Sequence, residues 1–215
     1  MNERKRMKKY LVMMLVLVLT FSLTGCEDDS AMSAKPIIYL YPEEETEVSV
    51  KLDYNGRLTS TYPSYNDGWN VIAKSDGTIY SPENDREYYC LFWEGINNFK
   101  ADFSEGFVVP GDETEAFLED SLAKLGLTEK EANEFIIYWL PKMEGNEYNL
   151  ISFQGDRYTE NAKLEITPTP DSVLRVFMAW KALDKPIEIK PQTLQGVERK
   201  GFTVVEWGGT EVTMN

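Results

Sequence analysis

Two glutamates lie in segments that combine aromatic residues with glycine, and they are candidates for acid–base chemistry. Glu94 follows a tryptophan and precedes a glycine, and Glu206 lies between a valine and the Trp-Gly-Gly that follows it. Paired carboxylates about 5 to 10 Å apart carry out glycoside hydrolysis, one as the acid and one as the base or nucleophile. The alternative is two strand-end glutamates that bind main-chain N–H groups, Arg175 or Arg199. The sequence does not show whether the two carboxylates meet.

Most other catalytic chemistry is excluded or weakly indicated. The 215 residues contain no histidine, which excludes Ser-His-Asp triads, Cys-His pairs and histidine-bound metals. Ser121-Leu122-Ala123-Lys124 matches the S-x-x-K pattern of penicillin-recognising enzymes, but it lies in an expected amphipathic helix, where a solvated face explains it better. Two cysteines are too few for a thiolate metal cage. We therefore expect no cofactor, and an enzyme is less favoured than a binding protein.

Aromatic residues make up 13% of the chain and are candidates for ligand binding. Such side chains combine an apolar ring with a polar edge, so they stack on sugars or line a peptide groove. From their positions we select Trp69, Tyr88, Trp93 and Trp207 as candidate binding residues. The alternative is that they belong to the core, where most aromatic residues of strands lie.

Calcium is the one metal that the composition allows, because its ligands are oxygens. Asn66-Asp67-Gly68 and the acidic segment 81–87 could each provide a loop, although neither has EF-hand spacing. Acidic solvated turns are the alternative interpretation. A glycan, calcium or a protein is therefore the ligand to consider. Nucleic acid is not expected, since 36 acidic and 22 basic residues give a net charge of −14.

The N-terminal residues have the pattern of a secretory signal. Residues 4–9 carry five basic side chains, and an apolar run follows from Tyr10 to Leu19. Leu23-Thr24-Gly25-Cys26 then resembles the lipobox of bacterial lipoproteins. An uncleaved transmembrane anchor is the alternative, because the stretch from Tyr10 to Leu23 is only marginally short of the roughly 20 apolar residues that a spanning helix needs.

The resemblance to lipoproteins implies a location and a modification. Residues 1–25 would be removed, and Cys26 would carry a diacylglyceryl group that anchors the chain to the outer side of a bacterial cell membrane. Removing residues 1–25 changes the net charge from −14 to −18. Cys90 would then have no partner for a disulfide, and we expect it to be a small buried residue.

The remainder of the chain is expected to fold as α+β. Residues 26–35 are polar and are predicted to be a tether, and residues 36–215 one domain, or two joined halves at 36–97 and 98–215. Period-two alternation and turn residues predict strands, which in order are 37–41, 48–54, 69–74, 78–80, 87–93, 148–153, 163–167, 173–180, 187–190 and 202–207. The strand 173–180 should be central, because both of its faces are apolar apart from Arg175.

Between the two groups of strands, the spacing predicts a helical hairpin over residues 112–140. Asp112 with Glu115, and Thr128 with Glu131, match the capping box that begins a helix. Gly126 and Pro141 are expected to end the two helices. The expected fold is an antiparallel sheet or sandwich with this two-helix hairpin packed on it.

Three segments also resemble an uncharacterised family of bacterial exported lipoproteins: Lys35–Pro42, Leu91–Gly95 and Gly201–Gly209. The resemblance covers the chain from about Lys35 to its end and implies a domain that recurs as a unit, with no known activity. We therefore expect an extracytoplasmic lipoprotein with a ligand-binding or envelope-associated role. The alternatives are an envelope glycan hydrolase that uses Glu94 and Glu206, and a structural or assembly lipoprotein that docks a protein partner.

Overall fold

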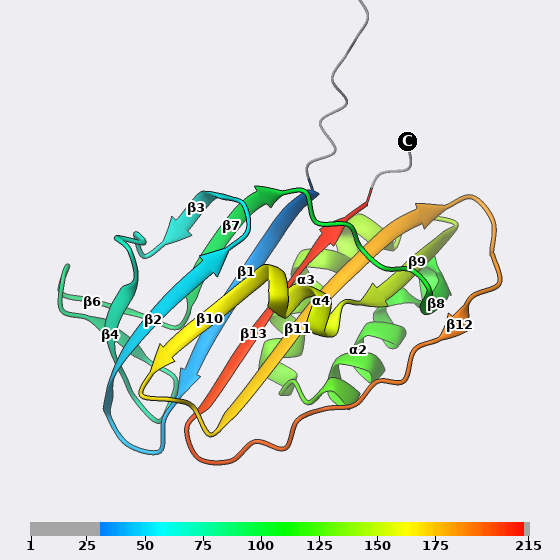
Figure 1. Cartoon of the computed structure of the whole chain (residues 1–215). Helices are drawn as coiled ribbons and strands as arrows, with labels where there is room; N and C mark the ends of the chain where they lie inside the picture. The colour runs from blue at the N-terminus through cyan, green and yellow to red at the C-terminus, as the bar shows by residue number, and fades with distance from the viewer. Residues whose placement is uncertain (1–30, 213–215) are drawn as a thin grey trace, which may run out of the picture.

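The computed structural model describes residues 31–212, which form three layers (Figure 1). An eight-stranded sheet lies in the middle, two helices cover one of its faces, and a five-stranded sheet covers the other. Each face of the middle sheet therefore has its own hydrophobic core, one shared with the helices and one with the smaller sheet. The predicted α+β class, with antiparallel sheets and a helical hairpin, is confirmed.

The two sheets use strands from all parts of the chain. The eight-stranded sheet has the order β12-β8-β9-β11-β13-β1-β7-β3, and the five-stranded sheet the order β10-β2-β4-β5-β6. The strands are β1 (Ala31–Tyr41), β2 (Thr46–Tyr54), β3 (Arg57–Tyr62), β4 (Trp69–Ala73), β5 (Ile79–Ser81), β6 (Arg86–Tyr88), β7 (Leu91–Asn97), β8 (Glu105–Pro110), β9 (Tyr148–Phe153), β10 (Ala162–Thr167), β11 (Ser172–Leu183), β12 (Lys190–Pro191) and β13 (Thr203–Glu211). The pairs β11–β13 and β12–β8 are parallel, and the others are antiparallel.

β11 lies near the centre of the larger sheet, as its apolar sequence predicts. Val176 and Met178 face the helices, whereas Phe177 faces the five-stranded sheet. The neighbouring β13 alternates in the same way, with Val205 on the helix side and Val204 on the other. Both strands are buried on two faces, which explains their nearly continuous apolar sequences.

The helical hairpin consists of α2 (Thr114–Leu125) and α3 (Glu129–Met143). The capping box of α3 is confirmed, because the Thr128 hydroxyl accepts the Glu131 N–H and the Glu131 carboxylate accepts the Thr128 N–H. The capping box predicted at Asp112 is wrong: a short 3-10 turn η1 (Gly111–Glu113) precedes α2, which has no side-chain cap bond. The predicted end of α3 at Pro141 is also wrong: the helix continues through Pro141 to Met143, which is fully buried.

Several predicted boundaries differ from the structure. The predicted strand 87–93 is split between β6 and β7, which belong to different sheets, because the chain crosses between the layers there. The predicted strand 187–190 is reduced to β12, and β3, β8 and the short helix α4 (Gly155–Asn161) had no clear sequence pattern. β1 begins at Ala31, so part of the predicted tether 26–35 pairs in the sheet.

The segment that carries the predicted membrane signal, residues 1–25 with Cys26, lies outside the described residues. None of the helices between residues 31 and 212 has both the length and the apolar composition that a membrane-spanning helix requires.

Candidate functional site

The two glutamates of the predicted catalytic pair lie on opposite faces of the larger sheet. Glu206 is fully buried between the two sheets, where its Oε2 lies 2.6 Å from Arg175 Nε and its Oε1 accepts the Trp93 Nε1–H at 3.1 Å. Glu94 is the next residue after Trp93 in β7 and so points to the helix side. It accepts the main-chain N–H of Lys35 at 3.3 Å. The sheet separates the two carboxylates, and the geometry of glycoside hydrolysis is absent.

Three of the four predicted binding aromatics are core residues. Trp69, Trp93 and Trp207 are 3%, 0% and 0% exposed, because the three-layer fold buries both faces of the strands that carry them. In this structure their rings are therefore closed off from solvent, in the places that the alternative interpretation as core residues predicts. Tyr88 is half-buried and lies edge-on to the exposed ring of Tyr62, with 5.2 Å between ring centroids.

The two predicted calcium loops meet, but their side chains bind each other. Asn66 Nδ2 of the first loop donates to Glu83 Oε1 of the second at 2.8 Å, and Asp85 Oδ1 of the second loop accepts the hydroxyl of Tyr80 in the preceding strand β5 at 2.8 Å. Across residues 31–212, no group of three or more acidic or cysteine side chains is arranged to hold a metal ion. The structure therefore gives no support to calcium as a ligand.

The serine and cysteine noted in the sequence are not placed for chemistry. Ser121 is buried, whereas Lys124 points into solvent and pairs with Asp120 at 2.5 Å. Cys90 is buried too, and this burial raises the pKa of its thiol to about 12. A thiol with this pKa is protonated at neutral pH, which agrees with the predicted packing role.

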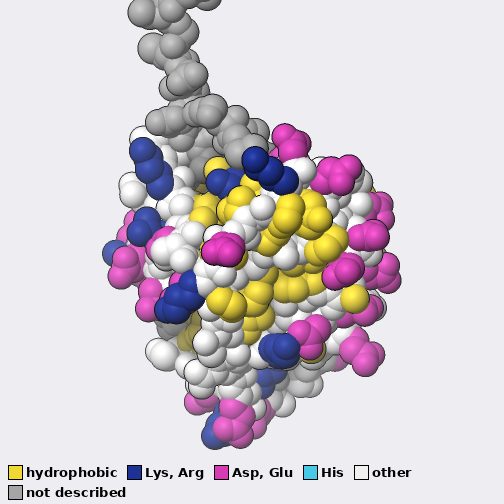
Figure 2. Space-filling view, turned by 90° about the vertical axis from the view of Figure 1, so that its right-hand side faces the viewer, with side chains coloured by type: hydrophobic (Ala, Val, Ile, Leu, Met, Phe, Trp, Pro, Cys, Tyr) yellow, Lys and Arg dark blue, Asp and Glu magenta, His cyan; other side chains and the backbone are white. Residues whose placement is uncertain are grey.

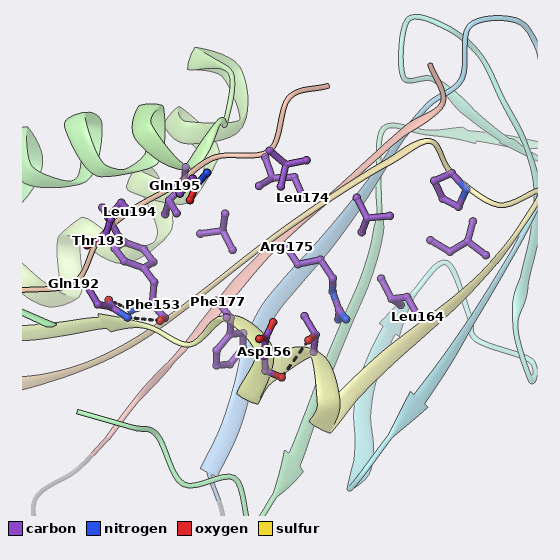
Figure 3. Close-up of a pocket in the computed structure, with 18 of the residues that line it drawn as sticks. Phe153, Asp156, Leu164, Leu174, Arg175, Phe177, Gln192, Thr193, Leu194 and Gln195 are labelled. Atoms are coloured by element: carbon purple, nitrogen blue, oxygen red, sulfur yellow. Dashed lines mark hydrogen bonds between the residues drawn. The ribbon is translucent and has the colours of Figure 1, made fainter. Parts of the chain in front are cut away.

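A groove of about 810 Å³ opens beside β11 (Figure 3). Its size is in the usual range for ligand sites, and most of its lining is apolar. The lining residues come from β11, from α4, from β10 and from the segment 192–197, which crosses the end of the helix layer. In Figure 3, Gln192 to Gln195 lie on the helix side of β11, and Asp156 and Leu164 lie on the other side.

The groove exists because β9 is shorter than β11. β9 ends at Phe153 and pairs only with the stretch Met178–Leu183, after which the chain turns away into α4. The first part of β11 therefore has β13 on one side and no strand on the other. All five residues from 173 to 177 line the groove, although their side chains alternate between the two faces of the sheet. The groove thus surrounds an open strand edge.

Main-chain hydrogen-bonding groups face this opening. The Phe177 carbonyl accepts the Gln154 N–H at 2.9 Å, which shows that Phe177 points its main-chain groups to the β9 side. Alternate residues of a strand point the same way, so the N–H and C=O groups of Val173 and Arg175 also face the groove. Ser172 points the other way, because its N–H bonds to Phe202 next to β13. No residue from 31 to 212 pairs with the groove-facing groups of Val173 and Arg175.

A buried charged cluster lies behind the groove. The side chain of Arg175 is 8% exposed, bonds to Glu206, and lies 4.8 Å from the centre of the Tyr158 ring. Burial lowers the pKa of Arg175, but the charge of Glu206 more than compensates and the net shift is upward. Burial also holds the pKa of Tyr158 well above its usual value. Arg175 Nη2 is buried and has no hydrogen-bond partner among the described residues.

The outer wall of the groove is held by a glutamine and a glycine. The side-chain amide of Gln192 bonds to both main-chain groups of Phe153, as a neighbouring strand would. Its Nε2 donates to the Phe153 carbonyl at 2.7 Å, and its Oε1 accepts the Phe153 N–H at 2.9 Å. Gly196 lies against the end of α2, where a Cβ would be 2.8 Å from the Lys124 carbonyl oxygen. The wall is therefore fixed at both ends. Sequence reasoning missed this site, because residues 192–197 show no periodicity.

A second surface feature is an apolar hollow on the β8 side of the molecule. Figure 2 shows hydrophobic side chains gathered over this side, with acidic side chains along one flank. The hollow has a volume of about 620 Å³, and β8, the start of the helix layer and residues 187–191 form it. Its apolar side chains include Phe107, Phe117, Ile187 and Ile189.

Comparisons with known proteins give one informative match. No family model matches the chain, and no solved structure matches it. Over 95 residues the chain is 44% identical to a Butyrivibrio fibrisolvens protein described as "Uncharacterized protein in bglA 3'region". The match covers 41% of this chain and 97% of that protein. The chain therefore belongs to the same family as this Butyrivibrio fibrisolvens protein.

Proposed function

We propose that this protein is a lipid-anchored, extracytoplasmic binding protein of a bacterial membrane, and that the groove beside β11 is its ligand site. The observation that carries the proposal is the open edge of β11 within an apolar groove of about 810 Å³. Apolar walls with a few fixed polar groups are typical of ligand sites. Here the polar groups are the main chain of Val173 and Arg175 and the exposed carboxylate of Asp156.

The sheet register supports a ligand site that faces away from the membrane. Only four residues separate Cys26 from Ala31, where β1 begins, and an extended chain spans at most about 3.6 Å per residue. The start of β1 would therefore lie close to the bilayer. Ser172 is level with Thr203, which pairs with Tyr41 at the other end of β1. The groove thus opens at the end of the sheet opposite to the anchor.

The anchor is tested by exchanging each cysteine in turn. The full chain is expressed in a bacterium, and the membrane and soluble fractions are compared for wild type, Cys26→Ser and Cys90→Ser. We expect Cys26→Ser to prevent lipid attachment, while Cys90→Ser is lipidated like the wild type. If Cys26→Ser still carries lipid, or if the wild type carries none, the lipoprotein assignment is wrong.

The ligand site is tested by thermal unfolding of the full chain in detergent with peptides, envelope glycans and divalent ions. A ligand at about 100 times its Kd adds roughly 2.7 kcal/mol of stability. Val173→Arg places a charge at the groove, where Val173 is 40% exposed, and Ile137→Arg is the matched control on the exposed face of α3. We expect a ligand-induced shift that Val173→Arg abolishes and Ile137→Arg preserves. A shift that survives Val173→Arg would place the ligand elsewhere.

Docking of a protein partner is a second candidate function, favoured by the apolar hollow beside β8. Ile187 is 45% exposed within this hollow, and Ile137 is exposed outside it. A photo-reactive residue at position 187 is expected to form a discrete crosslinked product in intact cells, and one at position 137 is not. Equal crosslinking from both positions would argue against a specific docking face.

A further inference from the structure

We infer that the groove beside β11 binds an extended peptide segment, which adds to the open edge of β11 as a further strand. This inference rests on the proposed function and specifies its ligand class. It depends on three features of the site: the main-chain groups at the edge, the space on both sides of the edge, and the positions of the chain ends.

The main-chain groups at the edge are spaced as another extended polypeptide would require. Val173 and Arg175 each present an N–H and a C=O to the groove, and alternate residues of a strand are about 6.6 Å apart. Another extended main chain has N–H and C=O groups at the same repeat, so it can satisfy both residues at once. A sugar or an inorganic ion has no such repeat.

The groove also has room for side chains on both sides of an added strand. On the helix side, a ligand side chain would meet Leu174 and Leu194; on the other side it would meet Leu164 and Ile166. Successive side chains of a strand point to opposite faces, so both apolar walls would be used. Asp156 lines the groove and is exposed, with no ion pair among the described residues. These features favour a peptide with apolar side chains and a basic residue.

Both ends of the described part of the chain lie away from the groove. Ala31 and Val212 both lie at the end of the sheet away from the groove, since Ala31 pairs with Asn97 and Val212 bonds to Trp180. Residues 192–197 and α4 line the groove on either side of the edge, so a sheet edge of a second copy would meet these two walls, whereas a single extended segment can enter between them. The ligand is therefore a separate peptide segment.

The test begins with a library of random 12-residue peptides displayed on phage. The library is selected on the full chain purified in detergent and counter-selected on its Val173→Pro variant. Proline at this position removes an N–H that faces the groove, and proline is tolerated on strand edges. Val173→Ala is the matched control, because it removes the side chain and keeps this N–H. Thermal unfolding confirms that each variant is folded.

An enriched peptide is then synthesised in two N-methylated forms, each methylated at one set of alternate residues. We expect Val173→Pro to weaken binding at least tenfold and Val173→Ala less than threefold. One methylated form should lose binding and the other keep it, because only one edge of the peptide would face β11. This comparison leaves the protein unchanged, so it holds even if a variant is unstable.

The inference is wrong if no peptide is enriched, if Val173→Pro binds like the wild type, or if both methylated forms bind equally. In those cases a glycan or ion whose thermal shift is abolished by Val173→Arg would leave the proposed ligand site intact. If neither a peptide nor any other ligand depends on the groove, the inference and the proposed ligand site both fail.

Discussion

The buried ion pair between Arg175 and Glu206 illustrates how single residues acquire a role through their surroundings. Both side chains are nearly inaccessible, and Glu206 also accepts the Trp93 N–H. Charges at this depth are held by their partners, since an unpaired one is strongly destabilising. The ion pair therefore holds the Arg175 side chain in place behind the groove, and Glu206 is too deeply buried to reach a substrate.

Replacing Glu206 by glutamine should destabilise the protein by about 3 kcal/mol or more, because it leaves the Arg175 charge buried without compensation. The double variant Arg175→Met, Glu206→Gln should recover a large part of this loss, since it removes both charges and keeps an acceptor for Trp93. Urea unfolding of the two variants and the wild type measures the effect. A double variant less stable than Glu206→Gln would contradict this explanation.

Glu131 provides a pH-dependent test at the same scale. Burial raises the pKa of Glu131, but hydrogen bonds from Arg199 and from the Thr128 N–H outweigh it and hold the pKa below its usual value near 4.5. A carboxyl whose pKa is lowered by folding adds stability above its unfolded pKa, and this stability is lost as the pH falls. The stability difference between wild type and Glu131→Gln should therefore shrink below about pH 4.5. A difference that grows on acidification would refute the assignment.

At the scale of elements, the two helices begin in different ways although their sequences look alike. Thr128 caps α3 through its side chain, whereas Asp112 lies in the turn η1 and makes no cap bond to α2. The capping-box pattern is local, but Pro110 and Gly111 extend the chain from β8 into a 3-10 turn and shift the start of α2 to Thr114. The sequence therefore predicted one cap correctly and one wrongly.

This difference can be measured by two matched substitutions. Thr128→Ala should cost about 1 kcal/mol of stability, because it leaves the Glu131 N–H without its cap acceptor. Asp112→Ala should cost less than about 0.5 kcal/mol, as an exposed residue without a cap bond. The midpoints of chemical unfolding give both values. Equal losses would indicate that Asp112 caps α2 in solution.

At the scale of the whole molecule, the domain begins earlier than its composition indicates. Residues 31–35 are mostly polar or small and were predicted to belong to a tether, but Ala31–Ser33 pair with β7 and Ala34 with β13. The start of β1 thus joins two neighbouring strands of the central sheet. Polar composition alone does not reveal this pairing, because its partners lie more than 60 residues away.

A chain that begins at residue 36 should therefore be less stable than one that begins at residue 31. The loss should be about 2 kcal/mol, since each lost main-chain hydrogen bond is worth roughly 0.5–1.5 kcal/mol. Urea unfolding of the two soluble chains, 31–215 and 36–215, tests this expectation. Identical unfolding midpoints would show that residues 31–35 add no stability, as expected of a tether.

The sequence by itself determined the α+β class, the helical hairpin, the central position of β11 and most strands, because these follow from periodicity and turn residues over short stretches. Only the tertiary structure decided that Glu94 and Glu206 lie on opposite faces of one sheet. It also decided that β9 stops short of Val173 and leaves a groove. These outcomes depend on strand order and register between distant segments, which local patterns do not encode.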